Sequence, residues 1–317
     1  MTDPLPWLLQ AEEPWVRWGA LRLARPDDVD AIEATRRETL ADPRVRALID
    51  EVVGPAWPPM TNHKQAKHPL HKAALLAELG LRARDPEGRV LAEQLMAHPA
   101  EDGPFQVLEL VPKVFGGTGE PGWDWMGCDA PLVLWTVAEL GLADDERAVR
   151  AADRLAALAD PEGWLCHSSI GMQGPGKKTD PCPYATLISV RALQRFAAHR
   201  EGEAVRAGAE MLLGHWARQA EVKLRMFGIG TDFKKAKVPF VWYDLLHVLD
   251  VLSRLPWVHD DPRFREMLDV LADKPDADGR IKPESVWMAF KGFDFAQKRG
   301  PSPTLTLAAA RILRRVG

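Results

Sequence analysis

Apolar residues recur along this chain in long helical blocks that end in similar short sequences. Residues 77–81, 138–142 and 253–257 each close such a block, and an Asp and an Arg follow each end before a second block begins. The equivalent leucines of the first two ends, Leu79 and Leu140, are 61 positions apart. The equivalent leucine of the third end, Leu255, follows 115 positions after Leu140, which is close to two such intervals. Self-similarity at a fixed interval predicts a repeated structural unit.

Two kinds of helix alternate within each repeat. Residues 131–142 and 240–255 are apolar almost all round, which is typical of helices buried on every side. Residues 146–158 are amphipathic and are expected to cover the buried set with one face. Turns of an acidic residue and glycine, such as Glu162-Gly163, separate the hairpins. About five to six such hairpins predict an all-α fold, an α/α toroid with two concentric helix layers.

We expect a single α/α-toroid domain over residues 1–317, because no linker or shift in composition divides the chain. Residues 1–50 are helical but do not match the repeat, whereas residues 60–317 contain the repeated hairpins. Long loops rich in Gly, Pro and Lys precede the buried helices, and in a ring they would gather at one mouth. These loops comprise residues 55–69, 114–122, 171–183 and 224–239.

The charge pattern excludes some classes of partner. The formal net charge is −4 and the pI is about 6.2, so the basic surface that a nucleic-acid-binding protein needs is missing. The amino terminus lacks the basic segment followed by an apolar run that is typical of a secretory signal. No apolar run reaches the length of a membrane span. We therefore expect a cytoplasmic protein without a transmembrane segment, whose cysteines stay reduced.

The chain has three cysteines, Cys128, Cys166 and Cys182, and each lies where a turn or loop leads into an apolar helix. A ring of repeats would bring these positions together. Three thiolates with one His or Asp form a tetrahedral zinc site, which makes zinc the expected metal. Separations of 38 and 16 residues fit no compact zinc module. Burial of the cysteines as small apolar side chains, and a redox pair, therefore stay open as alternatives.

The candidate fourth zinc ligands are Asp244, His167 and His247, and Asp244 is favoured because the repeats place it at the same helix start as Cys182. His167 adjoins Cys166 and is better placed to orient a ligand than to bind the same ion. An aspartate at this mouth could act as a general acid or base, although Asp129 and Asp244 also suit helix capping. The candidate catalytic residues are Asp129, Tyr243, Asp244 and His167, and the candidate metal ligands are Cys128, Cys166, Cys182 and Asp244.

Histidines are concentrated just before the first matched helix, at His63, His68 and His71. His68 and His71 are three residues apart, a spacing that places two side chains on one helix face. They are either a metal-binding pair or loop and cap residues, and the sequence leaves both open.

Three short segments resemble the prenyltransferase and squalene-cyclase repeat superfamily, and more narrowly a group of bacterial squalene-cyclase-like proteins of unassigned activity. They are Gly163-Trp164-Leu165-Cys166, Tyr243-Asp244-Leu245-Leu246 and Asp278-Gly279-Arg280. The resemblance implies an α/α toroid with a central cavity. It does not extend to the clustered aspartates with which squalene cyclases protonate an alkene. Toroids similar to this one, the protein prenyltransferases and lanthionine cyclases, hold a zinc that activates a thiol.

These observations predict a zinc-dependent transferase, cyclase or hydrolase. Its substrate would be a small apolar or isoprenoid-like molecule in an aromatic-lined central cavity. The alternative is a non-catalytic toroid that binds a lipid or a protein. A third reading is a carbohydrate-active α/α barrel in which Asp129 and Asp244 form an acid pair.

Overall fold

The computed structural model describes residues 2–166, 168, 179–221, 223–224 and 227–317. The chain divides into two compact units. Unit 1 comprises Met1–Leu48 and Gly230–Gly317, and unit 2 comprises Ile49–Ile229. The expectation of a single domain remains a prediction.

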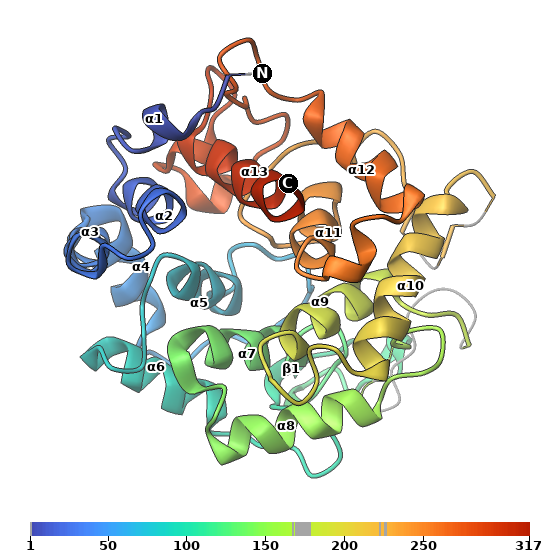
Figure 1. Ribbon diagram of the computed structural model, residues 1–317. Helices are drawn as coiled ribbons and strands as arrows, with labels where there is room; N and C mark the ends of the chain where they lie inside the picture. The colour runs from blue at the N-terminus through green and yellow to red at the C-terminus, as the bar shows by residue number, and fades with distance from the viewer. Residues whose placement is uncertain (1, 167, 169–178, 222, 225–226) are drawn as a thin grey trace. The chain divides into compact units, whose positions relative to one another are not determined.

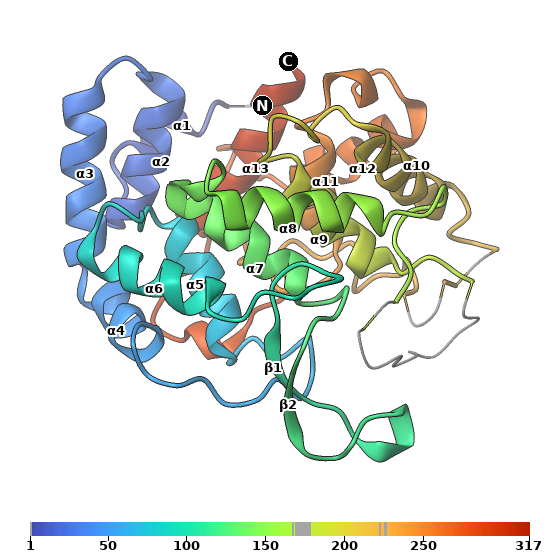
Figure 2. The same ribbon diagram turned by 90° about the horizontal axis from the view of Figure 1, so that it is seen from below.

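Unit 2 is built from three helical hairpins. The first helix of each is buried, and these are α5 (Pro69–Glu78), α7 (Ala130–Val137) and α9 (Pro183–Leu193). The second helices are α6 (Pro86–Met96), α8 (Glu146–Ala157) and α10 (Glu203–Ala217). Helix α7 packs between α5 and α9, while α8 covers α7 and α9 (Figure 2). Every residue of α7 is buried, as its largely apolar sequence predicts.

Unit 2 also contains an antiparallel ribbon that the sequence did not predict, formed by β1 (Val107–Leu110) and β2 (Pro121–Asp124). Figure 2 shows the ribbon extending away from the helices of this unit. Val107 lies opposite Asp124, and Leu108 lies opposite Trp123. Opposed residues share a face and successive residues alternate, so Glu109 and Asp124 lie on the same face. Both of these carboxylates are buried.

Unit 1 contains helices from both the amino-terminal and the carboxy-terminal segments of the chain. Its helices are α1 (Leu5–Leu8), α2 (Pro14–Ala24), α3 (Val29–Ala41), α11 (Leu245–Leu252), α12 (Pro262–Ala272) and α13 (Pro303–Val316). Helix α4 (Pro43–Val52) contains the boundary with unit 2. Helix α13 packs on α2 and α11 (Figure 1). Trp15 Nε1 donates to Thr304 Oγ1 at 2.7 Å. The opening helices therefore complete the packing around the last helix.

The predicted fold class is confirmed, because buried and covering helices alternate in hairpins as they do in α/α toroids. The repeated helix ends behave alike as well. Gly80 and Gly141 have φ angles of 100° and 96°, the left-handed conformation that ends a helix and favours glycine. Across the described ranges, no helix is both long and apolar enough to cross a membrane.

Candidate metal centre and an adjoining acid–histidine cluster

The three cysteines of unit 2 meet at one point. The sulfur atoms of Cys128, Cys166 and Cys182 all lie within 4.8 Å of one another, and all three are free thiols. Four ligands around zinc with bonds of about 2.3 Å would place the sulfurs about 3.8 Å apart. Cys128 and Cys182 are buried and Cys166 is half-buried. The spacing therefore suits one tetrahedral metal ion.

Two backbone contacts hold these cysteines in place. Met126 and Ser168 form an antiparallel bridge, which brings the segment of Cys166 alongside that of Cys128. The backbone N–H of Cys182 donates to the carbonyl of Trp164 at 2.7 Å. Trp164 is itself fixed, because its side chain is only 2% exposed. Segments that are distant in the sequence are thus held together by the contacts of Met126 with Ser168 and of Cys182 with Trp164.

The thiols of Cys128 and Cys182 hold their protons tightly without a metal. A hydrogen bond with Cys128 lowers the pKa of Cys182, but the hydrogen bond with Cys166 and burial outweigh it and raise that pKa to about 12. Hydrogen bonds with the other two thiols, and then burial, raise the pKa of Cys128 well above its usual value. A metal ion that binds thiolates must therefore displace these protons.

A second cluster adjoins the thiols, because Asp129 directly follows Cys128. Asp129 is fully buried, and its Oδ2 pairs with Nδ1 of His63. Its other oxygen, Oδ1, has no hydrogen-bond partner in the described structure. Burial acts to raise the pKa of Asp129, but the charge and hydrogen bond of His63 and a hydrogen bond from Glu109 lower it overall. Asp129 is therefore ionised at neutral pH.

Glu109 reaches Asp129 from the buried face of the ribbon. Burial, followed by the negative charges of Asp129 and Asp124, raises the pKa of Glu109 to about 11. Glu109 therefore keeps its proton at neutral pH, and a protonated carboxyl can donate a hydrogen bond to Asp129. Protonated Glu109 therefore holds ionised Asp129 without adding a negative charge of its own.

His63 differs from its two neighbouring histidines. Burial lowers its pKa, but the charge and hydrogen bond of Asp129 and the nearby Cys166 raise it overall. Its side chain is 23% exposed, which gives it access to solvent. His68 instead caps α5, and burial lowers the pKa of His71 to about 4, so that its ring is neutral. His63 is therefore the histidine of this group that carries charge most readily.

Two of the remaining predicted site residues, Asp244 and Tyr243, belong to unit 1. Asp244 belongs to unit 1, where it caps α11 by accepting the His247 N–H at 3.0 Å. Burial raises its pKa to about 7, although the nearby Lys237 acts to lower it. Tyr243, also in unit 1, packs its ring 5.1 Å from that of Phe233. Their expected roles as ligand and catalytic residue stay predictions, and His167 lies outside the described residues.

Two features of this cluster were not expected. Asp129 makes no capping hydrogen bond, unlike Asp244, so the capping alternative holds for only one of the two aspartates. Glu109 and Asp124 were missed altogether. The alternation in Val107-Leu108-Glu109-Leu110 was the available signal, because it places Glu109 on the same face as the apolar Val107.

Comparisons with known proteins reach only the level of the fold. No protein-family model matches the chain, and no curated protein matches it. Among solved structures, the chain is similar to the GH76 alpha-mannanase of Bacteroides thetaiotaomicron, with a TM-score of 0.47 and 10% identity. The match covers 99% of this chain and 86% of that one. Similarity this low transfers no activity to the present chain.

The comparison nevertheless corrects the predicted function. The expected action on an apolar or isoprenoid-like substrate is contradicted, because a solved structure to which the chain is similar is an alpha-mannanase. The alternative, a lipid- or protein-binding toroid, gains no support. The narrower resemblance to prenyltransferases and squalene cyclases is not confirmed, and neither is a small apolar ligand in a central cavity. The three clustered cysteines remain the strongest chemical feature of the chain.

Proposed function

We propose that unit 2 is a metal-binding module in which Cys128, Cys166 and Cys182 hold a zinc ion, with a fourth position open to a reacting molecule. The observation that carries this proposal is the mutual approach of the three sulfur atoms within 4.8 Å. Three buried or half-buried thiols gathered from distant segments are a far more specific arrangement than three separately buried cysteines.

The donor set supports zinc over most other ions. Thiolates are soft ligands that select zinc, Cu(I) or iron–sulfur clusters, whereas magnesium and calcium prefer oxygen. Three protein ligands with one open position are typical of catalytic zinc, and four protein ligands are typical of structural zinc. Zinc bound here would supply a Lewis acid that lowers the pKa of a thiol or water at the open position.

The neighbouring cluster supports a reactive site rather than a purely structural one. His63 is held through Nδ1 by Asp129, which leaves Nε2 as the ring atom able to accept a proton. Glu109 fixes Asp129 in turn, so the imidazole is oriented by two successive acids. An imidazole oriented by a carboxylate is the usual arrangement of a general base. The reaction class is therefore the activation of a thiol or water for nucleophilic attack.

Metal analysis of the purified chain tests the proposal. We expect about one zinc per chain by mass spectrometry of the dissolved metal, and sulfur neighbours at about 2.3 Å by X-ray absorption. Replacing all three cysteines with serine should abolish binding. Absence of metal after growth with added zinc, or equal metal in the triple variant, would contradict the proposal.

Two single variants assign the surrounding residues. Asp244→Asn keeps an oxygen that can cap α11, and it should lose zinc only if Asp244 is the fourth ligand that the sequence predicted. His63→Ala should keep the zinc, because the three thiolates remain. A His63→Ala protein without zinc would make His63 a ligand instead of a base.

A further inference from the structure

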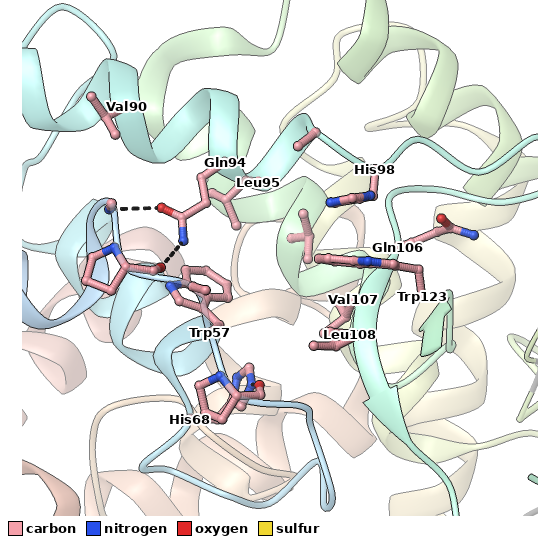
Figure 3. Close-up of a pocket in the computed structure, with 16 residues that line it drawn as sticks. Trp57, His68, Val90, Gln94, Leu95, His98, Gln106, Val107, Leu108 and Trp123 are labelled. Atoms are coloured by element: carbon pink, nitrogen blue, oxygen red, sulfur yellow. Dashed lines mark hydrogen bonds between the residues drawn. The ribbon is translucent and has the colours of Figure 1, made fainter. Parts of the chain in front are cut away.

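A cavity of about 400 Å³ lies against the ribbon, and Leu108 and Trp123 line it from the ribbon face opposite to Glu109. It is bounded by residues 54–58, helix α6, β1 and Trp123 of β2 (Figure 3). Figure 3 shows Trp57 on one side of this space and Trp123 with His98 on the other. Val133 also lines it. Its volume falls within the range of about 300–1,000 Å³ that is typical of small-molecule sites.

Apart from two histidines, the walls of this pocket contain no ionisable side chain. Sixteen residues line it, and none of them is an Asp, Glu, Lys or Arg. An ion that entered would exchange its hydration for apolar and aromatic surface, at a cost of several kcal/mol. Phosphates, carboxylates and ammonium groups are therefore poor ligands for this site.

Two polar side chains of the wall, Trp57 and Gln94, already make hydrogen bonds to backbone groups. Trp57 Nε1 donates to the Val52 carbonyl at 2.9 Å. The Gln94 side chain accepts from the Gly54 N–H at 3.1 Å and donates to the Pro55 carbonyl at 3.0 Å, as Figure 3 shows. A ligand with many hydroxyl groups would lose its bonds to water and would find these groups of Trp57 and Gln94 already engaged.

Aromatic rings and exposed apolar side chains supply the attraction. Trp57 packs edge-on to His68, with ring centroids 6.0 Å apart and an interplanar angle of 86°. His98 stacks on Trp123, with centroids 3.4 Å apart and an angle of 16°. Trp123 and Val90 are each 48% exposed although both line the pocket. A ligand that covers them would remove apolar surface from water.

We propose that this pocket binds an uncharged aromatic ring compound whose polar groups lie along one edge. The ring occupies the space between Trp57 and Trp123, where edge-to-face and offset-stacked contacts are favourable. The polar edge faces the open mouth, toward solvent. This site is separate from the cysteine centre and does not depend on metal.

Titration of the full chain with indole tests the proposal, by calorimetry and by ligand-observed NMR. Two probes provide contrast: indole-3-acetate adds a negative charge, and methyl mannoside replaces the aromatic ring with a neutral polyol. Indole is expected to bind, and each contrast probe should bind at least about tenfold more weakly, a difference of about 1.4 kcal/mol. Absence of indole binding, or equal or tighter binding of either contrast probe, would overturn the proposal.

Variants locate the site. Val90→Trp changes an exposed side chain at the rim, so it should block indole without unfolding the protein. Trp57→Ala should weaken indole binding by removing one wall. The matched control is Trp257→Ala, because Trp257 is 38% exposed and belongs to unit 1. Loss of indole binding in the control, or full binding in Val90→Trp, would place the ligand elsewhere.

Discussion

The backbone N–H of Cys182 donates to the carbonyl of Trp164 at 2.7 Å, and this bond ties the start of α9 to the segment that carries Cys166. Trp164 is the fixed point of the arrangement. Its Nε1 donates to the Leu155 carbonyl at 2.9 Å, and its backbone N–H donates to Thr186 Oγ1, also at 2.9 Å. The positions of two thiols therefore depend on how one tryptophan is held.

Thr186→Val should destabilise the protein and weaken metal binding together. Thr186 is fully buried, and valine matches its shape but leaves the Trp164 N–H without this acceptor. An unsatisfied buried donor costs about 1–3 kcal/mol. Urea unfolding measures the loss of stability, and competition with a chelator measures the loss of zinc affinity.

Thr136→Val is the matched control for that change. Thr136 is equally buried, but its hydroxyl only donates to the Leu132 carbonyl within the same helix. That carbonyl belongs to the helix ladder, so the substitution should be nearly neutral. Equal effects of the two substitutions would show that the Trp164 contact does not position the cysteines.

Two glycines of α10 should respond to alanine in opposite directions. A Cβ at Gly208 would lie 2.4 Å from Val190 Cγ2 and 2.9 Å from Trp164 Cζ3, so Gly208→Ala should cost about 1–3 kcal/mol. A Cβ at Gly214 would meet only the end of the Arg218 side chain at 3.8 Å. Gly214→Ala should therefore stabilise the helix by up to about 1 kcal/mol. Thermal unfolding distinguishes the two, and equal signs would contradict the packing.

Removal of metal should destabilise the chain as purified. A ligand present at about 1,000 times its dissociation constant adds about 4 kcal/mol to the free energy of unfolding. A strong chelator should therefore lower the melting temperature, and added zinc should restore it. Cys182→Ser should already melt lower and should respond far less to chelator. A wild-type melting temperature indifferent to chelator would contradict the metal centre.

The repeats could be predicted because each one is specified locally. The sequence Ala-Glu-Leu-Gly-Leu ends a helix twice, and in both places the glycine adopts the left-handed conformation that such an end requires. The meeting of the cysteines could also be predicted. Cys182 is the N-cap residue of α9, and Cys128 directly precedes Asp129, the N-cap residue of α7. Neighbouring repeats place such helix starts side by side.

The acid cluster could not be predicted in the same way. Glu109 lies in a strand of four residues, and its partner strand follows only after a loop rich in glycine. A strand pair this short has no register until the rest of the unit packs on it. The pairing of His63 with Asp129 joins residues 66 positions apart through no repeated feature. Such contacts depend on tertiary packing, which local pattern does not encode.

Stability should fall in mild acid partly because of His215. This histidine is only 1% exposed, and its Nε2 lies 3.2 Å from the Phe227 carbonyl oxygen. Burial lowers its pKa to about 4. Between the unfolded pKa of about 6.5 and that value, the unfolded chain binds a proton that the folded chain does not. The free energy of unfolding should therefore fall as pH drops through this window, by about 1.4 kcal/mol per pH unit from this residue.

His215→Gln keeps a side-chain N–H that can donate to the Phe227 carbonyl but cannot take up the proton. Above a pH of about 7, the free energy of unfolding of the variant should depend on pH as that of wild type does. As the pH falls from about 6.5 toward 4, the variant should lose less stability than wild type. Urea unfolding at several pH values gives the difference in free energy of unfolding between the variant and the wild type. The contributions of His68 and His71 cancel in this difference, because both proteins contain these two histidines. Thr136→Val, which removes no ionisable group, should run parallel to wild type. If the His215→Gln curve is parallel as well, His215 is not the buried neutral base that its packing in α10 implies.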